Sequence, residues 1–494
     1  MNTIQRIAKN TAALTIANIA NAILNFFFVM YVARYLGVEG FGTLSFALAF
    51  TAIFGVLTDI GLSTLTIREV GRDRSLAKKY LGNIAVLKTI LVIATFGLIA
   101  LTANLLGYPE QTIHVVYLIA LSVVFNTFSL MFYSIFQAHE RMEFVTIGQI
   151  LNSVLLLAGA LFAISKDLSV TAFAFAYLLA SIVTLGCNSI ISTWRVAKPK
   201  IEVDIVFWKE SLKQAWPFGL TVVFSAVYTG ISSVLLSSIQ GDDAVGWYNA
   251  AYRVALFLWF IPAAYSNSVF PIMSRFYVSS RESLRLVYEK SVKYVFLLAV
   301  PIGVGITLLA PVAIPLIFGS EYSNSIIALQ ILAWSMVFIS VNSLVAQLFN
   351  SVNKQIIVTK VTGSCMLLNV LLNVVLIPRY SYIGAGIAAV LTQLVALVLL
   401  FIWSFKLGYG IPGKKLVGIV AKVLIAGAIM GILVFYLRDL SLWVLVPLSA
   451  LLYLAVLYII RGIDREDMLL IRQSVGRQTV GVLERAPKSP NRKK

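Results

Sequence analysis

Long apolar segments separated by short charged stretches dominate this chain of 494 residues. An α-helix of about 20 apolar residues crosses a bilayer, and it satisfies its own backbone hydrogen bonds, as any segment in lipid must. The apolar segments give about fourteen candidate spans. They lie near residues 12–33, 42–61, 81–103, 113–136, 144–164, 170–194, 212–238, 246–271, 290–317, 325–349, 357–378, 383–405, 415–437 and 441–460. The pattern predicts an all-α polytopic membrane protein.

The composition excludes other classes of protein. Hydrophobic residues make up 60% of the chain and charged residues 12%, whereas about 25% of the residues in a soluble domain are charged. A soluble domain is excluded, and so is a disordered chain, because disorder requires low hydrophobicity.

The basic residues alternate between the two sides of the predicted membrane. Lys and Arg number 39 against 21 Asp and Glu. About 32 of the 39 fall on the N-terminus, the even-numbered connections and the C-terminal tail, and cytoplasmic loops carry such an excess. We therefore expect a multi-pass protein of the cell (inner, cytoplasmic) membrane with both termini in the cytoplasm. Its basic loops would contact anionic lipids, and nothing in their pattern indicates nucleic-acid binding.

Two halves of the chain resemble each other. Residues 40–42 (Gly-Phe-Gly) and 246–248 (Gly-Trp-Tyr) enter the second and eighth spans, and residues 120–125 resemble 333–338. Two copies of six spans have the same orientation, so they should be related by an axis along the membrane normal, with a cavity between them. The predicted units are an N-terminal lobe (1–194), a basic cytoplasmic linker (195–211), a C-terminal lobe (212–406), an extra helix pair (407–460) and a basic tail (461–494).

Polar side chains form a stripe within the first span and its counterpart in the seventh. Spacings of three and four residues place them on one helical face. They are Asn18, Asn21 and Asn25, with Ser225, Tyr228 and Ser232 in the second lobe. Two interpretations stay open, because such residues either join helices by hydrogen bonds or line a hydrated cavity.

Three cations lie inside predicted spans. Arg253 has no acidic residue at a helical spacing, so its guanidinium needs water, a distant carboxylate or an anionic ligand, and its planar fork suits phosphate. Lys88 and Lys422 are weaker candidates for the same anion site, because either ammonium could instead extend to the nearby cytoplasmic interface.

Asp59 is the only carboxylate that the pattern places within the first two predicted spans. It could pair with Arg68 or Arg253, which we favour, or bind a coupling ion such as H⁺ or Na⁺. The two histidines, His114 and His139, lie far apart without neighbouring Cys, which argues against a metal site. No G-x-x-x-x-G-K-[ST] loop is present, so neither ATP hydrolysis nor a cofactor is expected.

Three segments carry a family resemblance: residues 34–42, 59–69 and 245–253. With the 6 + 6 + 2 arrangement of spans, the chain resembles the polysaccharide flippase family of the multidrug/oligosaccharidyl-lipid/polysaccharide exporter superfamily. The resemblance implies two lobes that alternate between inward-open and outward-open states. It implies transport of polyprenyl-pyrophosphate-linked oligosaccharide from the cytoplasmic to the outer leaflet for polysaccharide or glycan export. It also implies a cationic cavity, and proteins of polysaccharide assembly as partners.

Three alternatives remain. A lipid II flippase shares the fourteen-span plan. A drug antiporter of the same superfamily usually has twelve spans and cavity carboxylates, whereas the predicted spans of the second lobe contain no Asp or Glu. A polytopic glycosyltransferase or polymerase is disfavoured, because the outer loops are short and Asp242-Asp243 is their one acidic pair. We therefore expect a transporter without catalytic residues.

Overall fold

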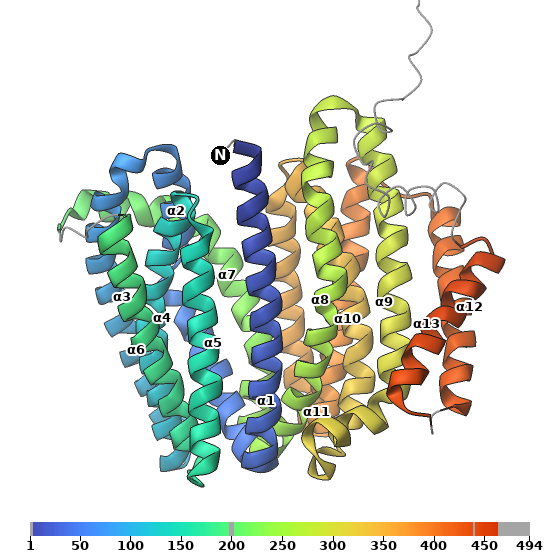
Figure 1. The fold of residues 1–494 in the computed structure, drawn as a ribbon, viewed down its shortest axis with the longest axis horizontal. Helices are drawn as coiled ribbons and strands as arrows, with labels where there is room; N and C mark the ends of the chain where they lie inside the picture. Colours follow the sequence, from blue (N-terminus) through green and yellow to red (C-terminus); the bar gives the residue numbers. More distant parts are fainter. Residues whose placement is uncertain (1–2, 197–201, 438–439, 463–494) are drawn as a thin grey trace, which may run out of the picture.

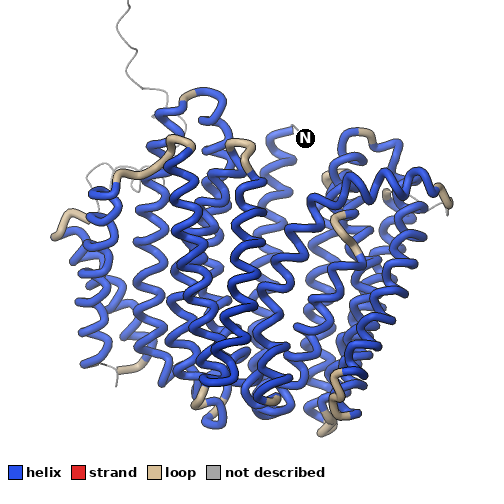
Figure 2. The backbone as a smooth tube through the Cα atoms, turned by 180° about the vertical axis from the view of Figure 1, so that it is seen from behind, coloured by secondary structure: helices blue, strands red, loops and turns tan. Residues whose placement is uncertain are grey.

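The computed structural model describes residues 3–196, 202–437 and 440–462, and within these ranges the regular structure is entirely helical (Figures 1 and 2). The helices of the first half are α1 (Thr3–Gly55), η1 (Val56–Thr58), α2 (Leu62–Arg72), η2 (Arg74–Leu76), α3 (Ala77–Leu105), α4 (Glu110–Ala138), α5 (Met142–Ser165) and α6 (Val170–Arg195). Those of the second half are α7 (Ile205–Gln240), α8 (Asp242–Ser279), α9 (Arg281–Phe318), η3 (Ser320–Tyr322), α10 (Ser325–Ser351), α11 (Gln355–Lys406), α12 (Gly413–Tyr436) and α13 (Leu442–Ile459).

The two longest helices each contain a reversal of the chain. In α1 the backbone leaves helical geometry at Gly37 (φ 67°, ψ −174°), and in α11 it does so at Ser381 (φ 50°, ψ −135°). A Cβ on Gly384 would lie 2.5 Å from the carbonyl oxygen of Leu376, whereas eight residues of straight helix extend about 12 Å. The described residues contain 12 helices able to cross a membrane, and these two reversals raise the crossings to about fourteen, as predicted.

The helices form two bundles with an extra pair at one edge. Figure 1 shows α1 to α6 on one side, α8 to α11 beside them, and α12 and α13 beyond α9. One hydrophobic core, which includes Phe41, Tyr248 and Tyr322, is shared by both bundles. Two further cores belong to one bundle each, one around Leu81 and the other around Tyr288. The bundles are therefore joined at the end formed by the reversal of α1 and the α7–α8 turn, and their cores are separate towards the opposite end.

Pairs of equivalent residues form the joined end. Gly37 and Gly241 both have positive φ, at 67° and 86°, and each precedes a helix. A Cβ on Gly42 would collide with the carbonyl oxygen of Asp242, and one on Gly246 would collide with that of Val38. Three pairs of positions are therefore equivalent at one offset of 204 residues: Gly37 and Gly241, Val38 and Asp242, and Gly42 and Gly246. The structure thus supports the predicted repeat, but it pairs Gly246 with Gly42 rather than with Gly40.

Hydrogen bonds to backbone carbonyl groups also hold the two bundles together at this joined end. The Tyr322 hydroxyl donates to the carbonyl oxygens of Ala33 (2.9 Å) and Gly37 (2.8 Å). Arg34 Nε donates to that of Ile317 (2.7 Å), and its Nη2 donates to that of Leu316. Four carbonyl groups near helix ends, which lack partners within their helices, are satisfied across the two bundles.

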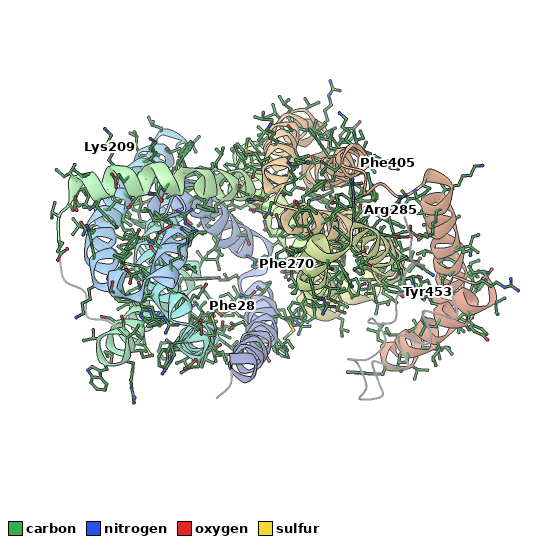
Figure 3. All side chains as sticks on the ribbon, turned by 90° about the horizontal axis from the view of Figure 1, so that it is seen from above. Phe28, Lys209, Phe270, Arg285, Phe405 and Tyr453 are labelled. Carbon is green, nitrogen blue, oxygen red and sulfur yellow. The ribbon has the colours of Figure 1, made fainter. Side chains whose placement is uncertain are left out.

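Helix α7 connects the bundles and starts earlier than residue 212, where the seventh span was predicted. Asp204 caps it by accepting the backbone N–H of Phe207 (3.0 Å), and this hydrogen bond lowers the pKa of the Asp204 carboxyl. The first turns of α7 belong to the core of the first bundle through Ala215, and Gly219 lies close enough to Ile60 to exclude a side chain. Figure 3 shows this part of α7, near Lys209, lying over the first bundle.

Candidate functional site

A cavity of about 480 Å³ lies between the first limb of α1 and helix α8, and so between the two bundles. The reversal at Gly37 and the close contact at Gly42 set α1 beside α8, and both helices contribute to its walls. Its lining residues are Asn21, Ala22, Asn25, Phe26, Val29, Arg253, Val254, Leu256, Phe257, Trp259, Phe260, Ala263 and Phe318. This is the position where the repeat predicts a cavity.

Arg253 supplies the charge in this cavity. Its side chain is half-buried, and within the described part of the chain its buried Nε atom has no hydrogen-bond partner. Tyr177 of α6 and Tyr252 of α8 lie within electrostatic range of the guanidinium. The described residues that line the cavity include no Asp or Glu. A partly buried guanidinium with no acidic neighbour among the described lining residues favours an anionic ligand, because an uncompensated charge in a low dielectric is unfavourable.

The first span supplies amide groups opposite Arg253. Asn21 and Asn25 line the cavity, and Asn21 also accepts a hydrogen bond from Ser153 Oγ of α5 (2.9 Å). Asn21 thus both joins two helices and lines the cavity, so the two interpretations of the stripe apply together. The side chain of Asn18, the third member, lies outside the described residues.

Aromatic side chains make up much of the remaining wall. The rings of Phe26 and Phe257 lie 5.0 Å apart across α1 and α8. Trp259 presents a buried Nε1 that has no partner among the described residues. Indole and phenyl rings offer apolar area, and the indole N–H remains available as a donor. No sequence signal singled out these residues, since aromatic side chains at helical spacing are ordinary in a membrane span.

Tyr228 and Ser232 lie elsewhere, which corrects their prediction as lining residues of this cavity. The Tyr228 hydroxyl accepts a hydrogen bond from Gln393 Nε2 (2.9 Å), and Gln393 Oε1 accepts one from Asn342 (2.8 Å). Tyr228 lines a separate cavity of about 200 Å³ within the second bundle, and Ser232 is buried. Tyr228 therefore joins α7 to α11, and Ser232 lies within hydrogen-bonding distance of Tyr248 of α8, so these two members of the stripe serve interhelical hydrogen bonding.

Lys88 and Asp59 form a buried ion pair in the first bundle. Their Nζ and Oδ1 atoms lie 2.5 Å apart, and the side chain of Lys88 is 0% exposed. Lys88 also donates to Ser63 Oγ (3.2 Å) and to the carbonyl oxygen of Thr127 (3.3 Å). Both interpretations of Lys88, at the interface or in the anion site, are therefore wrong, and so is the pairing of Asp59 with Arg68 or Arg253.

Arg68 and Lys422 also lie outside the cavity. Arg68 Nε donates to Glu69 (2.6 Å) and Nη2 to Gln214 of α7 (2.8 Å), so it fixes α2 to the start of α7. Lys422 lies on α12 and donates to the carbonyl oxygen of Arg461 (2.8 Å). Of the predicted residues, the structure brings together Arg253, Asn21 and Asn25. Among the described residues, no group of three or more His, Cys, Asp or Glu could hold a metal ion.

Two family models match the sequence. The model described as "Polysaccharide biosynthesis protein" matches residues 7–277, which is more than half of the chain, and the model described as "MatE" matches residues 217–375.

Individual proteins show the same relationship at lower identity. "Probable low-salt glycan biosynthesis flippase Agl15" of Haloferax volcanii is 23% identical over 402 residues, which cover 80% of this chain and 82% of that protein. "Capsular polysaccharide biosynthesis protein CapF" of Staphylococcus aureus is 21% identical, with coverage of 79% and 97%.

A solved structure shares the fold. It is that of "Lipid II flippase MurJ, inward closed conformation", which superimposes with a TM-score of 0.75 at 18% identity and covers 92% of this chain and 99% of that one. These matches confirm the predicted fold class and the family resemblance. The chain is a multi-pass membrane protein and belongs to the polysaccharide biosynthesis protein family.

Proposed function

We propose that this protein is a flippase for a polyprenyl-pyrophosphate-linked oligosaccharide, which it moves from the cytoplasmic to the outer leaflet. The observation that carries the proposal is Arg253, a guanidinium that has no acidic partner among the described residues and lies in a cavity between two repeated bundles. A related protein bears the name of a glycan biosynthesis flippase, which supports a glycan-bearing substrate.

The arrangement of the two bundles suits alternating access. The contacts at Gly42 and Gly246 close one end, while the separate cores leave the opposite ends of the bundles without a shared core. If the basic loops are cytoplasmic, the closed end faces outward, and the cavity receives substrate from the cytoplasmic leaflet. Arg253 would bind the pyrophosphate, and Asn21 and Asn25 would bind hydroxyl groups of the first sugars.

No bond is made or broken in this process, so the protein acts as a transporter and not as an enzyme. Binding of the pyrophosphate would compensate the charge of Arg253, which lowers the electrostatic penalty of closing the cavity around both groups. A coupling ion at Asp59 would have to replace Lys88, since that ammonium already neutralises the carboxylate at 2.5 Å.

Translocation in proteoliposomes tests the proposal. A charge-assisted hydrogen bond contributes about 1.5–3 kcal/mol, so Arg253→Ala should reduce the rate of glycolipid transfer about tenfold or more. Arg253→Lys should retain part of the rate, because it keeps the charge and loses the planar fork. Arg379→Ala is the matched control, since Arg379 is an exposed arginine of α11 outside the cavity. Wild-type rates for Arg253→Ala would reject the proposal.

A lipid II flippase is the second candidate, because the similarity to the MurJ structure extends over 92% of this chain. Both substrates would present a pyrophosphate, so Arg253 variants cannot separate them. Parallel assays with lipid II and with a polyprenyl-pyrophosphate oligosaccharide separate them directly, and the faster substrate identifies the function. A drug antiporter is disfavoured, since none of the described residues that line the cavity carries a carboxylate.

A further inference from the structure

At the joined end, each bundle caps a helix of the other. Arg34 of α1 donates to two carbonyl groups in the last turn of α9, those of Leu316 and Ile317. Tyr322 of η3 donates to two carbonyl groups where the first limb of α1 ends. We call these four hydrogen bonds the reciprocal caps. Carbonyl groups in the last turn of a helix have no partner inside that helix, so the caps satisfy groups that would otherwise need water.

The reciprocal caps depend on closure of the joined end. In each of them the donor and the acceptor belong to opposite bundles, which approach at Gly42 and Gly246 closely enough to exclude a side chain. Separating the bundles at this end would break all four hydrogen bonds and leave the carbonyl groups to water. The caps therefore stabilise the closed state and contribute nothing to an open one.

Phe318 connects the reciprocal caps to the cavity of Arg253. Its side chain lines that cavity and is 3% exposed. Its ring lies 5.5 Å from the ring of Tyr322, measured between centroids. Its backbone directly follows Ile317, whose carbonyl oxygen accepts the hydrogen bond from Arg34. A single residue thus faces the cavity and adjoins both pairs of caps.

The local sequence explains why Phe318 and Tyr322 meet. Helix α9 ends at Phe318, and Gly319 follows with φ 102°, a conformation that favours glycine. The Gly319 N–H donates to the carbonyl oxygen of Pro315 (3.0 Å), and the chain then turns through η3 to Tyr322. On its other side Tyr322 lies 6.3 Å from Phe41 of α1 between ring centroids. Both bundles therefore fix the position of the Tyr322 ring.

A ligand that fills the cavity competes with Phe318 for space. A bulky ligand bound to Arg253 would displace the phenyl ring, and this would disturb both its contact with Tyr322 and the neighbouring Ile317. A ligand shifts an equilibrium only by its difference in affinity for the two states. Displacement of Phe318 supplies such a difference, because it is unfavourable only while the caps hold the ring in place.

We propose that Phe318 couples occupancy of the Arg253 cavity to the reciprocal caps, so that a bound substrate opens the joined end. The inference rests on the proposed function, because the ligand is the pyrophosphate-bearing substrate of that function. It assigns to Arg34 and Tyr322 the stabilisation of the closed state. Arg34 also begins the segment 34–42 that carries the family resemblance, and the residues of that segment do not line the cavity.

Spin labels at Leu106 and Asp243, in a protein without its two native cysteines, measure opening of the joined end. The probe is farnesyl pyrophosphate, which carries a pyrophosphate on a short polyprenyl chain. It should raise the ratio of open to closed states of the wild type about tenfold. Phe318→Ala should lose this response and bind the probe about threefold more tightly, because the cavity then admits the ligand without opening. Phe296→Ala removes a buried phenylalanine of α9 outside the cavity and should respond as the wild type does.

Tyr322→Phe tests the reciprocal caps without a ligand. It keeps the ring beside Phe318 and removes two hydrogen bonds, so the ratio of open to closed states should rise about tenfold. The same variant should bind farnesyl pyrophosphate more tightly by up to the same factor, because the state that the ligand favours is already populated. Tyr35→Phe is the matched control, since the Tyr35 hydroxyl donates to Asp167 (2.8 Å) within the first bundle, and it should leave the ratio unchanged.

The outcomes separate this inference from the proposed function. Opening by the probe that Phe318→Ala abolishes, while the probe still binds, supports the coupling. If Phe318→Ala opens as the wild type does, or if the probe binds through Arg253 without opening the wild type, the coupling is overturned and the proposed function stands. If the probe does not bind, or binds Arg253→Ala as tightly as the wild type, the proposed function fails and the coupling fails with it.

Two further results decide the remaining cases. Equal ratios of open to closed states for Tyr322→Phe and Tyr35→Phe would overturn the role of the reciprocal caps. If Phe318→Ala fails to fold, Phe318→Leu replaces it, because leucine keeps apolar volume but lacks the ring that contacts Tyr322. Its response to farnesyl pyrophosphate should be clearly smaller than that of the wild type, and a full response would overturn the coupling.

Discussion

The two bundles agree in how they meet and differ in the charges they bury. Gly42 and Gly246 make the same contact at an offset of 204 residues. In the first bundle Lys88 and Asp59 form a buried ion pair, with Nζ and Oδ1 2.5 Å apart. The first bundle thus neutralises its cation internally, whereas Arg253 of the second bundle has no acidic partner in the part of the chain that the structure describes. The comparison indicates that a paired intramembrane cation stabilises the fold and an unpaired one is available to a ligand.

The largest change in the free energy of unfolding is expected when the buried ion pair of Lys88 and Asp59 is broken. Lys88→Met leaves Asp59 without its cation, and removing one partner of a buried ion pair destabilises by about 3–5 kcal/mol. The free energy of unfolding in detergent should fall by that amount, and the double variant Lys88→Met/Asp59→Asn should recover most of it. A Lys88→Met protein of unchanged stability that no longer transports would instead assign Lys88 to the transport cycle.

Because Gly42 and Gly246 make equivalent contacts, equivalent substitutions at the two positions should shift the ratio of closed to open states equally. Gly42→Leu and Gly246→Leu each place a side chain against the backbone of the other bundle. Overpacking of this kind opposes closure by about 1–3 kcal/mol, which shifts the ratio of closed to open states about tenfold.

Spin labels at Leu106 and Asp243, in a protein without its two native cysteines, measure this shift as a longer distance across the closed end. Gly97→Leu is the control, since a Cβ at Gly97 meets nothing within 4 Å. Unequal shifts for Gly42→Leu and Gly246→Leu would contradict the symmetric closure.

An acidic residue introduced beside Arg253 should form an ion pair with it, as Asp59 does with Lys88 in the first bundle. Phe257 lines the same cavity four residues along α8, so Phe257→Glu places a carboxylate within reach of the guanidinium. The new pair should compete with the pyrophosphate and reduce the transfer rate about tenfold. Phe257→Gln changes the shape similarly without the charge and should transport faster than Phe257→Glu. Equal rates for the two variants would mean that the charge of Arg253 is not used.

The sequence predicted features that depend on composition and local periodicity. The apolar segments predicted the spans, and the glycines near positions 42 and 246 indicated the repeat. It could not predict the partner of Asp59, because Lys88 is 29 residues away on another helix and only packing brings them together. The sequence also could not show which helices the stripe around Tyr228 contacts. Helical spacing shows which residues share a face of one helix, but it does not show which other helix packs against that face.

The smallest effect is expected for the stability of an Arg253 variant. Arg253→Met removes a guanidinium whose Nε has no partner among the described residues, so no ion pair is lost and the free energy of unfolding should change by less than about 0.5 kcal/mol. Lys88→Met, measured in the same detergent, is the matched comparison, because it makes the same chemical change at a paired cation. Transport should show the reverse order, with Arg253→Met impaired as a folded protein and the stabilised double variant Lys88→Met/Asp59→Asn active. If Arg253→Met destabilised the protein as much as Lys88→Met, Arg253 would be held by a partner in the folded state, and a structural role would replace the ligand-binding one.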